Sequence, residues 1–223
     1  MPALRSITSL TLILCTAALF ISGCGGGVSI KNDSRPVEEV VSQAELLIKQ
    51  KAYAAAADQY QVAILKDSTV GQYYLRRAEV LERIDHDKEA RLTYERALKA
   101  VPEEDPSHLQ LMHRLALVNA NHLYKIEEAE DLLLRMPENS VEQIDLAAFL
   151  YYQSSQFELS ISLLNKALER VTDADQKALL LYHAALIYVE LGDQKNIFGS
   201  LFYSINNAEH LGLIRDIEQL WQE

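Results

Sequence analysis

The spacing of alanine and tyrosine residues constrains the fold of this chain more than any other feature. An Ala-x3-Tyr motif begins at Ala56 and again at Ala90, 34 residues later, and in both cases another alanine follows the tyrosine by three positions. A further alanine, Ala44 or Ala78, stands 12 positions upstream of each motif. Small residues where two helices cross let the helix axes approach, so the pattern predicts repeated pairs of packed helices.

The second of these units is the most complete. It reads Tyr74-x2-Arg77-Ala78-x2-Leu81, then Ala90-x3-Tyr94-x2-Ala97, then Pro102. This pattern resembles the tetratricopeptide repeat (TPR), whose motif over 34 residues is W-x2-L-G-x2-Y, then A-x3-F, then P. The resemblance implies an all-α fold of helix–turn–helix hairpins, of which at least three must stack because a single hairpin cannot bury both of its faces.

Three weaker units continue the series, around Ala129, between Phe157 and Ala167, and at the Leu191-Gly192-Asp193 turn. We therefore predict a right-handed TPR solenoid of about five repeats over residues 37–211, followed by a capping helix over residues 212–223. The predicted repeats are 37–70, 71–104, 110–140, 141–174 and 178–211. An ordinary helical bundle is the alternative, but it would lack the fixed 34-residue phase of the first two units.

The N-terminal segment predicts export and lipid attachment. Residues 7–21 carry no charge, follow a leader with one arginine, and are too few for the roughly 20 residues that a membrane-spanning helix needs. A charged leader, a short apolar core and small residues at its end are typical of a secretory signal peptide, here residues 1–23. The tetrapeptide ISGC, ending at Cys24, resembles the bacterial lipobox. The resemblance implies cleavage after Gly23 and acyl chains such as palmitate on Cys24.

Two alternatives stay open: an ordinary secreted protein in which Cys24 is incidental, and an uncleaved anchor. Residues 24–36 are small, polar and aperiodic, which predicts a flexible linker after the lipidated cysteine. More than one acyl chain holds a protein stably at a membrane, so we expect a lipid-anchored protein of the bacterial cell envelope. Gly25 stands where an inner-membrane retention signal would have Asp, which in a Gram-negative organism implies the outer membrane, facing the periplasm.

Charge and motif content argue against several classes of function. The chain has 21 Lys and Arg against 32 Asp and Glu, and nucleic-acid binding requires a basic surface, so no nucleic acid is expected as a partner. The six histidines form no HExxH motif, and the chain without its signal peptide keeps one cysteine. We therefore predict no catalytic residues, no metal and no cofactor beyond the covalent lipid on Cys24, and hence not an enzyme.

Seven residues are predicted to bind a partner. In TPR proteins the first helix of each hairpin lines a concave groove, and this family property is transferred here by position. The predicted groove residues are Glu45, Glu79 and Glu82 at an acidic end, and Phe149, Tyr152, Tyr182 and Leu186 at an apolar, aromatic end. Such a groove favours an apolar peptide or an amphipathic helix with a basic flank. The alternative is that the aromatic side chains pack in the core. Trp221 is expected to be buried against the fifth hairpin, with an exposed partner anchor as the alternative.

Together these features predict a membrane-anchored TPR scaffold or adaptor lipoprotein whose partners are envelope proteins. The architecture resembles that of pilotin-type lipoproteins, and the resemblance implies a role in type IV pilus or secretin assembly. Adaptors for β-barrel assembly or for cell-wall enzymes look similar and remain alternatives. A small-ligand carrier is another alternative. It predicts a closed pocket with converging polar groups, whereas a scaffold predicts an open groove.

Overall fold

A computed structural model of the chain describes residues 33–222. The predicted signal peptide, Cys24 and the linker up to residue 32 lie outside this range. Within it the chain forms eleven α-helices. The helices are α1 (Val37–Lys49), α2 (Tyr53–Lys66), α3 (Gly71–Arg83), α4 (Asp87–Ala100), α5 (His108–Asn121), α6 (Ile126–Arg135), α7 (Val141–Gln153), α8 (Phe157–Leu168), α9 (Ala174–Leu191), α10 (Gln194–Asn207) and α11 (Leu211–Gln222).

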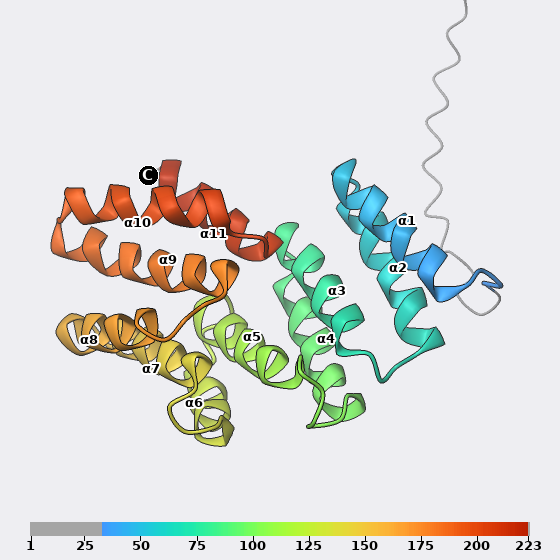
Figure 1. The fold of residues 1–223 in the computed structure, drawn as a ribbon, viewed down its shortest axis with the longest axis horizontal. Helices are drawn as coiled ribbons and strands as arrows, with labels where there is room; N and C mark the ends of the chain where they lie inside the picture. The colour runs from blue at the N-terminus through green and yellow to red at the C-terminus, as the bar shows by residue number, and fades with distance from the viewer. Residues whose placement is uncertain (1–32, 223) are drawn as a thin grey trace, which may run out of the picture.

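The first ten helices form five consecutive pairs, and each pair packs on the next along the chain (Figure 1). This arrangement confirms the predicted all-α, TPR-like fold class. The alanines of the repeat pattern lie where helices pack together: Ala44, Ala56, Ala78 and Ala90 are all fully buried. A larger side chain at any of these positions would force the two helix axes apart.

The tyrosines of the Ala-x3-Tyr motif also form hydrogen bonds within their helix pairs. Tyr94 on α4 is fully buried, and its hydroxyl donates a hydrogen bond to Glu82 on α3 at 2.6 Å. Tyr60 on α2 donates in the same way to Glu45 on α1. A buried hydroxyl needs a partner, so each of these tyrosines joins the second helix of its pair to a glutamate on the first.

Each of the five hairpin turns contains one residue in the left-handed region of backbone space. These residues are Lys51, Asp85, Tyr124, Ser155 and Gly192, with φ between 53° and 69°. In the first two turns the next residue donates a backbone hydrogen bond to the carbonyl five positions earlier, from Ala52 to Leu47 and from His86 to Leu81. Such bonds satisfy carbonyls that the end of a helix leaves unpaired.

The last helix, α11, does not simply cap the stack. It contacts α10 and also returns to α3, the first helix of the second pair (Figure 1). Leu213 and Ile217 of α11 are at most 2 % exposed. The apolar face of α11 therefore packs toward α3. Trp221 is not buried, contrary to the prediction: it is 46 % exposed, and its ring lies 5.8 Å from that of Phe198 on α10.

Residues 33–36, the end of the predicted linker, lie against α2. The Lys66 ammonium donates to the backbone oxygens of Asp33 and Arg35 at 2.6 and 2.7 Å. Arg35 in turn donates to Gln59 at 2.8 Å. The part of the linker that the structure describes is therefore tied to the first helix pair. No helix between residues 33 and 222 has the length and apolar character needed to cross a membrane.

Candidate partner-binding cleft

Contacts of the buried Arg215 hold α11 on the end of α3. The Arg215 guanidinium donates to the backbone oxygen of Glu82, in the last turn of α3, and lies 3.1 Å from Asp87 and 3.3 Å from Asp85. The last carbonyls of a helix are unpaired and carry partial negative charge, which a cation at this place satisfies. Burial opposes a charged Arg215, but the neighbouring Asp216 and Asp87 outweigh it and raise the pKa of Arg215.

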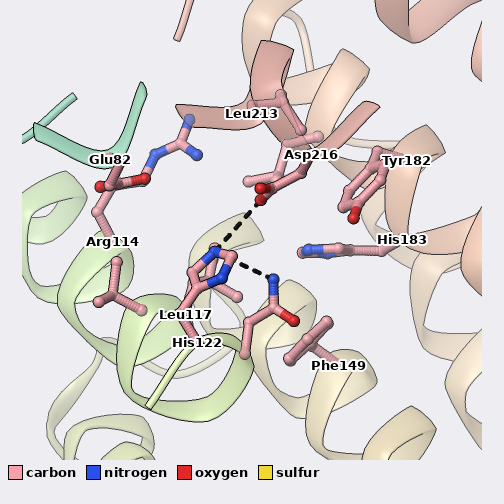
Figure 2. Close-up of a pocket in the computed structure, with 12 residues that line it drawn as sticks. Glu82, Arg114, Leu117, His122, Phe149, Tyr182, His183, Leu213 and Asp216 are labelled. Atoms are coloured by element: carbon pink, nitrogen blue, oxygen red, sulfur yellow. Dashed lines mark hydrogen bonds and ion pairs between the residues drawn. The ribbon is translucent and has the colours of Figure 1, made fainter. Parts of the chain in front are cut away.

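A small space, which we call the central cavity, lies beneath α11 and has a volume of about 30 Å³. Figure 2 shows Glu82 and Arg114 on one side of it and Phe149, Tyr182 and His183 on the other. A space of this size holds roughly two water molecules, so it is too small for a peptide or a cofactor.

One buried carboxylate joins the first helices of three hairpins. Asp145 on α7 accepts a hydrogen bond from His113 on α5 at 2.9 Å and from His183 on α9 at 2.7 Å. All three side chains are buried. Burial alone would raise the pKa of Asp145, but the charge of His183 and the two hydrogen bonds hold it well below its usual range. In the described residues no group of three or more His, Cys, Asp or Glu is arranged to hold a metal ion.

A cleft of about 690 Å³, which we call the concave cleft, lies along the first helices of the hairpins. It is lined by the first helices of all five hairpins together with the residues just before α9 and α11. Its charged and titratable lining residues are Glu45, Glu79, Glu142, Asp173, Asp175 and Glu209, with Arg76, Arg114, His113 and His210. Six carboxyl groups therefore face two arginines.

Both arginines of the concave cleft are already paired. Arg76 lies 2.5 Å from Glu79 and 3.1 Å from Glu45, and Arg114 lies 3.4 Å from Asp175. The positive charges of Arg76 and Arg114 are thus neutralised by carboxylates of the protein itself. The carboxylates that have no arginine partner, among them Glu142, give the cleft its acidic character.

Two carboxyl groups near the cleft are buried and hold protons more tightly than usual. Burial raises the pKa of Glu79 to about 7, against the opposing charges of Arg76 and Arg114. Burial likewise raises the pKa of Glu82 to about 7, against the hydrogen bond that Tyr94 donates to it. These groups change charge near neutral pH, where an ordinary glutamate is fully ionised.

The structure does not bring the seven predicted groove residues together. Glu45 and Glu79 line the concave cleft, whereas Glu82, Phe149 and Tyr182 line the central cavity under α11. Tyr152 and Leu186 are half-buried and line a third hollow, beside Tyr182. The single open groove with an aromatic end that we expected does not describe this structure, because α11 covers the surface between α3 and α9. Of the four apolar residues, Phe149 and Tyr182 are buried here, and a partner-binding role for any of the seven stays a prediction.

Sequence reasoning missed Asp175 and Glu209, which meet at one rim of the cleft. The Asp175 carboxylate accepts hydrogen bonds from the backbone N–H groups of Glu209 and His210, at 2.6 and 3.0 Å. This contact positions the turn that leads into α11. Nothing in the local pattern indicated it, because the two segments are 34 residues apart and meet only once α11 has folded back.

No family model matches this chain. No curated protein matches it either. Several solved structures have a similar fold. A TPR protein from Parabacteroides merdae is 17 % identical, with a TM-score of 0.55 over 84 % of this chain and 73 % of its own. A thermophilic TPR protein from Thermus thermophilus is 12 % identical, with a TM-score of 0.56 over 84 % and 100 %.

A third similar structure is PilW, a widely conserved type IV pilus biogenesis factor. It is 14 % identical to this chain, with a TM-score of 0.54 over 83 % of this chain and 92 % of PilW. Identities this low show a shared fold and nothing finer. The chain thus has the fold of TPR proteins, with sequential helix pairs, and its C-terminal helix returns to α3.

Proposed function

We propose that this protein is a lipid-anchored TPR scaffold of the bacterial envelope, and that it binds a basic segment of a protein partner in the concave cleft. The observation that carries this proposal is the charge of the cleft. Six carboxyl groups line it, and both of its arginines are paired internally. A segment with Lys or Arg would find complementary charge there, and such complementarity raises association rates and favours the correct partner.

The lining of the cleft supports a protein segment over a small apolar ligand. Small-molecule sites are lined mainly by apolar and aromatic side chains with few polar groups. Here the apolar lining is limited to Pro106, Leu109 and Leu179. An amphipathic helix could place a narrow apolar stripe on these three residues and its basic flank on the carboxylates. We therefore propose binding rather than catalysis as the role of this site.

The lipobox resemblance at Cys24 supports the place of action that we propose, the envelope and, in a Gram-negative organism, the periplasmic face of the outer membrane. Within the envelope, assembly of type IV pili or of secretins is the process that we propose. It rests on the likeness of a compact multi-repeat lipoprotein to pilotin-type proteins. A tethered scaffold of this kind would hold one partner close to the membrane and raise its effective concentration there.

The test reverses charge in the cleft of the full-length lipoprotein. Glu142→Lys combined with Glu209→Lys places two cations in the cleft, and Glu130→Lys combined with Glu158→Lys makes the same change on exposed positions of α6 and α8. Each protein captures its partners from solubilised envelopes, and each captured partner is then purified and titrated back. Circular dichroism first confirms that every variant keeps its helix content.

We expect one partner to be held by the wild type and by the α6/α8 variant and to bind the cleft variant at least about tenfold more weakly, because charge pairs at a partly buried interface are strongly coupled. That difference should shrink as salt screens the charges. Equal binding by the two double variants would contradict a role for the cleft.

A further inference from the structure

A second hollow, unrelated to the concave cleft, lies between α2, α3 and α4. We call it the α2–α4 pocket, and its volume is about 390 Å³. Ile64 and Leu65 of α2 form an apolar wall, and Arg77 of α3 and Arg96 of α4 supply two positive charges. The α2–α4 pocket shares no lining residue with the concave cleft.

Arg77 differs from the other partly buried arginines in having no carboxylate partner. Arg83 lies 2.6 Å from Glu218, and Arg76, Arg114 and Arg215 are also paired with acids. Within residues 33–222, no carboxylate oxygen lies within 4.0 Å of Arg77 or Arg96. A charge removed from water without a partner is costly, and proteins normally pair it.

The hydrogen bonds of Arg77 are also incomplete. One terminal nitrogen donates to the Thr93 hydroxyl, and Nε is buried without any hydrogen-bond partner in the described part of the chain. A guanidinium has five N–H donors, and a planar carboxylate can accept from two of them at once. Most of the donor capacity of this side chain is therefore unused inside the protein.

The electrostatic surroundings of Arg77 also favour binding of an anion. Burial, followed by repulsion from Arg96, lowers the pKa of Arg77, and the charges of Asp58 and Glu89 only partly offset this. In the paired Arg76 the charge of Glu79 and the hydrogen bonds that Arg76 donates to Glu45 outweigh burial and raise the pKa of Arg76. An anion placed between Arg77 and Arg96 would relieve both the repulsion and the unpaired charge.

We propose that the α2–α4 pocket is a binding site for a monoanionic carboxylate with a short apolar tail. The carboxylate would bridge Arg77 and Arg96, and the tail would pack on Ile64 and Leu65. A single charge fits better than a phosphate dianion, because Asp58 and Glu89 lie near Arg77 and the whole chain has a net charge of −11. Nothing in this proposal depends on the concave cleft.

The experiment titrates the full-length protein with butyrate and, separately, with butyramide, which has the same shape but no charge. Arginine Nε–H resonances in NMR spectra report binding at the guanidinium groups directly. We expect saturable shifts of the Arg77 and Arg96 signals with butyrate and none with butyramide. Arg96→Gln, on an exposed residue that should fold normally, is expected to weaken butyrate binding about tenfold.

The matched control is Lys88→Gln, which removes one positive charge from an exposed position of α4 outside the pocket and should leave butyrate affinity within about twofold of the wild type. Arg77→Gln should abolish butyrate binding. If that variant does not fold, the comparison of Arg96→Gln with Lys88→Gln tests the proposal. Three results would overturn the proposal: no saturable shift with butyrate, equal loss in Arg96→Gln and Lys88→Gln, or inorganic phosphate binding more tightly than butyrate at the same two arginines.

Discussion

Glu82 is the side chain at which the repeat and the C-terminal helix meet. Its carboxylate accepts a hydrogen bond from Tyr94 at 2.6 Å and lies 4.0 Å from a ring nitrogen of His210, while its backbone oxygen receives Arg215. The residue is 5 % exposed. Burial raises the pKa of Glu82 to about 7, so ionisation of this one group acts against the folded state at neutral pH.

The sign of this effect gives a prediction for Glu82→Gln. Between about pH 4.5 and pH 7 the folded protein holds a proton on Glu82 that the unfolded chain releases, so this group makes the wild type less stable as pH rises. Glutamine cannot ionise but can still accept the hydrogen bond from Tyr94. We expect the free energy of unfolding of Glu82→Gln, relative to the wild type, to increase by roughly 1–3 kcal/mol over this range.

Urea denaturation at several pH values measures the difference. Other groups also make stability depend on pH, among them Glu79, whose pKa burial raises to about 7, so only the comparison between variant and wild type is informative. Glu104→Gln, in the exposed turn before α5, is the control and should show no such trend. A relative stability of Glu82→Gln that stays constant or falls with pH would contradict a raised pKa at this residue.

At the scale of elements, the docking of α11 on α3 depends on a close approach at Gly212. A Cβ atom added to Gly212 would lie 2.2 Å from Oε2 and 2.8 Å from Cβ of Glu82. The first contact could be relieved by rotation of the Glu82 side chain, but the second is fixed by the backbone of α3. Gly212 therefore permits an approach between the two helices that no other residue would allow.

Gly212→Ala should lower the free energy of unfolding by about 1–3 kcal/mol, because α11 must move away from α3. The matched control is Gly199→Ala in α10, where an added Cβ meets nothing within 4 Å. Removing glycine from an exposed helix position should stabilise the protein by about 0.5–1 kcal/mol. Thermal and urea denaturation test both. If the two variants changed stability in the same direction, the close approach at Gly212 would not be important.

The hairpins themselves were predictable element by element, because their signals are local. Alanine spacing marked the helix crossings, and Ser140 is a residue type that commonly caps helices: its hydroxyl accepts from the backbone N–H of Gln143 at the start of α7. The turn conformations were not predictable in the same way. Only Gly192 among the left-handed turn residues is a glycine, and Lys51, Asp85 and Tyr124 adopt that conformation because the surrounding helix pairs impose it.

At the scale of the whole molecule, the C-terminal helix changes what the solenoid presents to a partner. An open stack of hairpins would expose the first helices along the entire concave face. Here α11 spans from the last pair to α3, and Phe149 and Tyr182 line the small cavity beneath it, whereas the acidic cleft is a large hollow. The shape of the binding surface thus depends on a contact between the C-terminal helix and the second helix pair.

The lipid anchor is the prediction that concerns the whole molecule in the cell. Cys24→Ser removes the thiol that a diacylglyceryl group would modify, so we expect it to abolish incorporation of labelled palmitate and to release the protein from the membrane fraction. Metabolic labelling and fractionation of the envelope measure the two effects. Cys15→Ser, within the predicted signal peptide, is the matched control and should leave both unchanged. A Cys24→Ser protein that still incorporates palmitate would contradict lipidation at this residue.

The helix pairs could be predicted from the sequence because their signals are local: helical periodicity spans one or two turns, and the 34-residue spacing of small and aromatic residues spans one hairpin. The sequence also placed Glu45 and Glu79 on the concave face, since position within a repeat decides which side of the first helix faces inward. The packing position of α11, in contrast, depends on contacts that form only in the folded chain. The contact of Arg215 with Glu82 joins residues 133 positions apart, and no local pattern encodes a pairing across that distance.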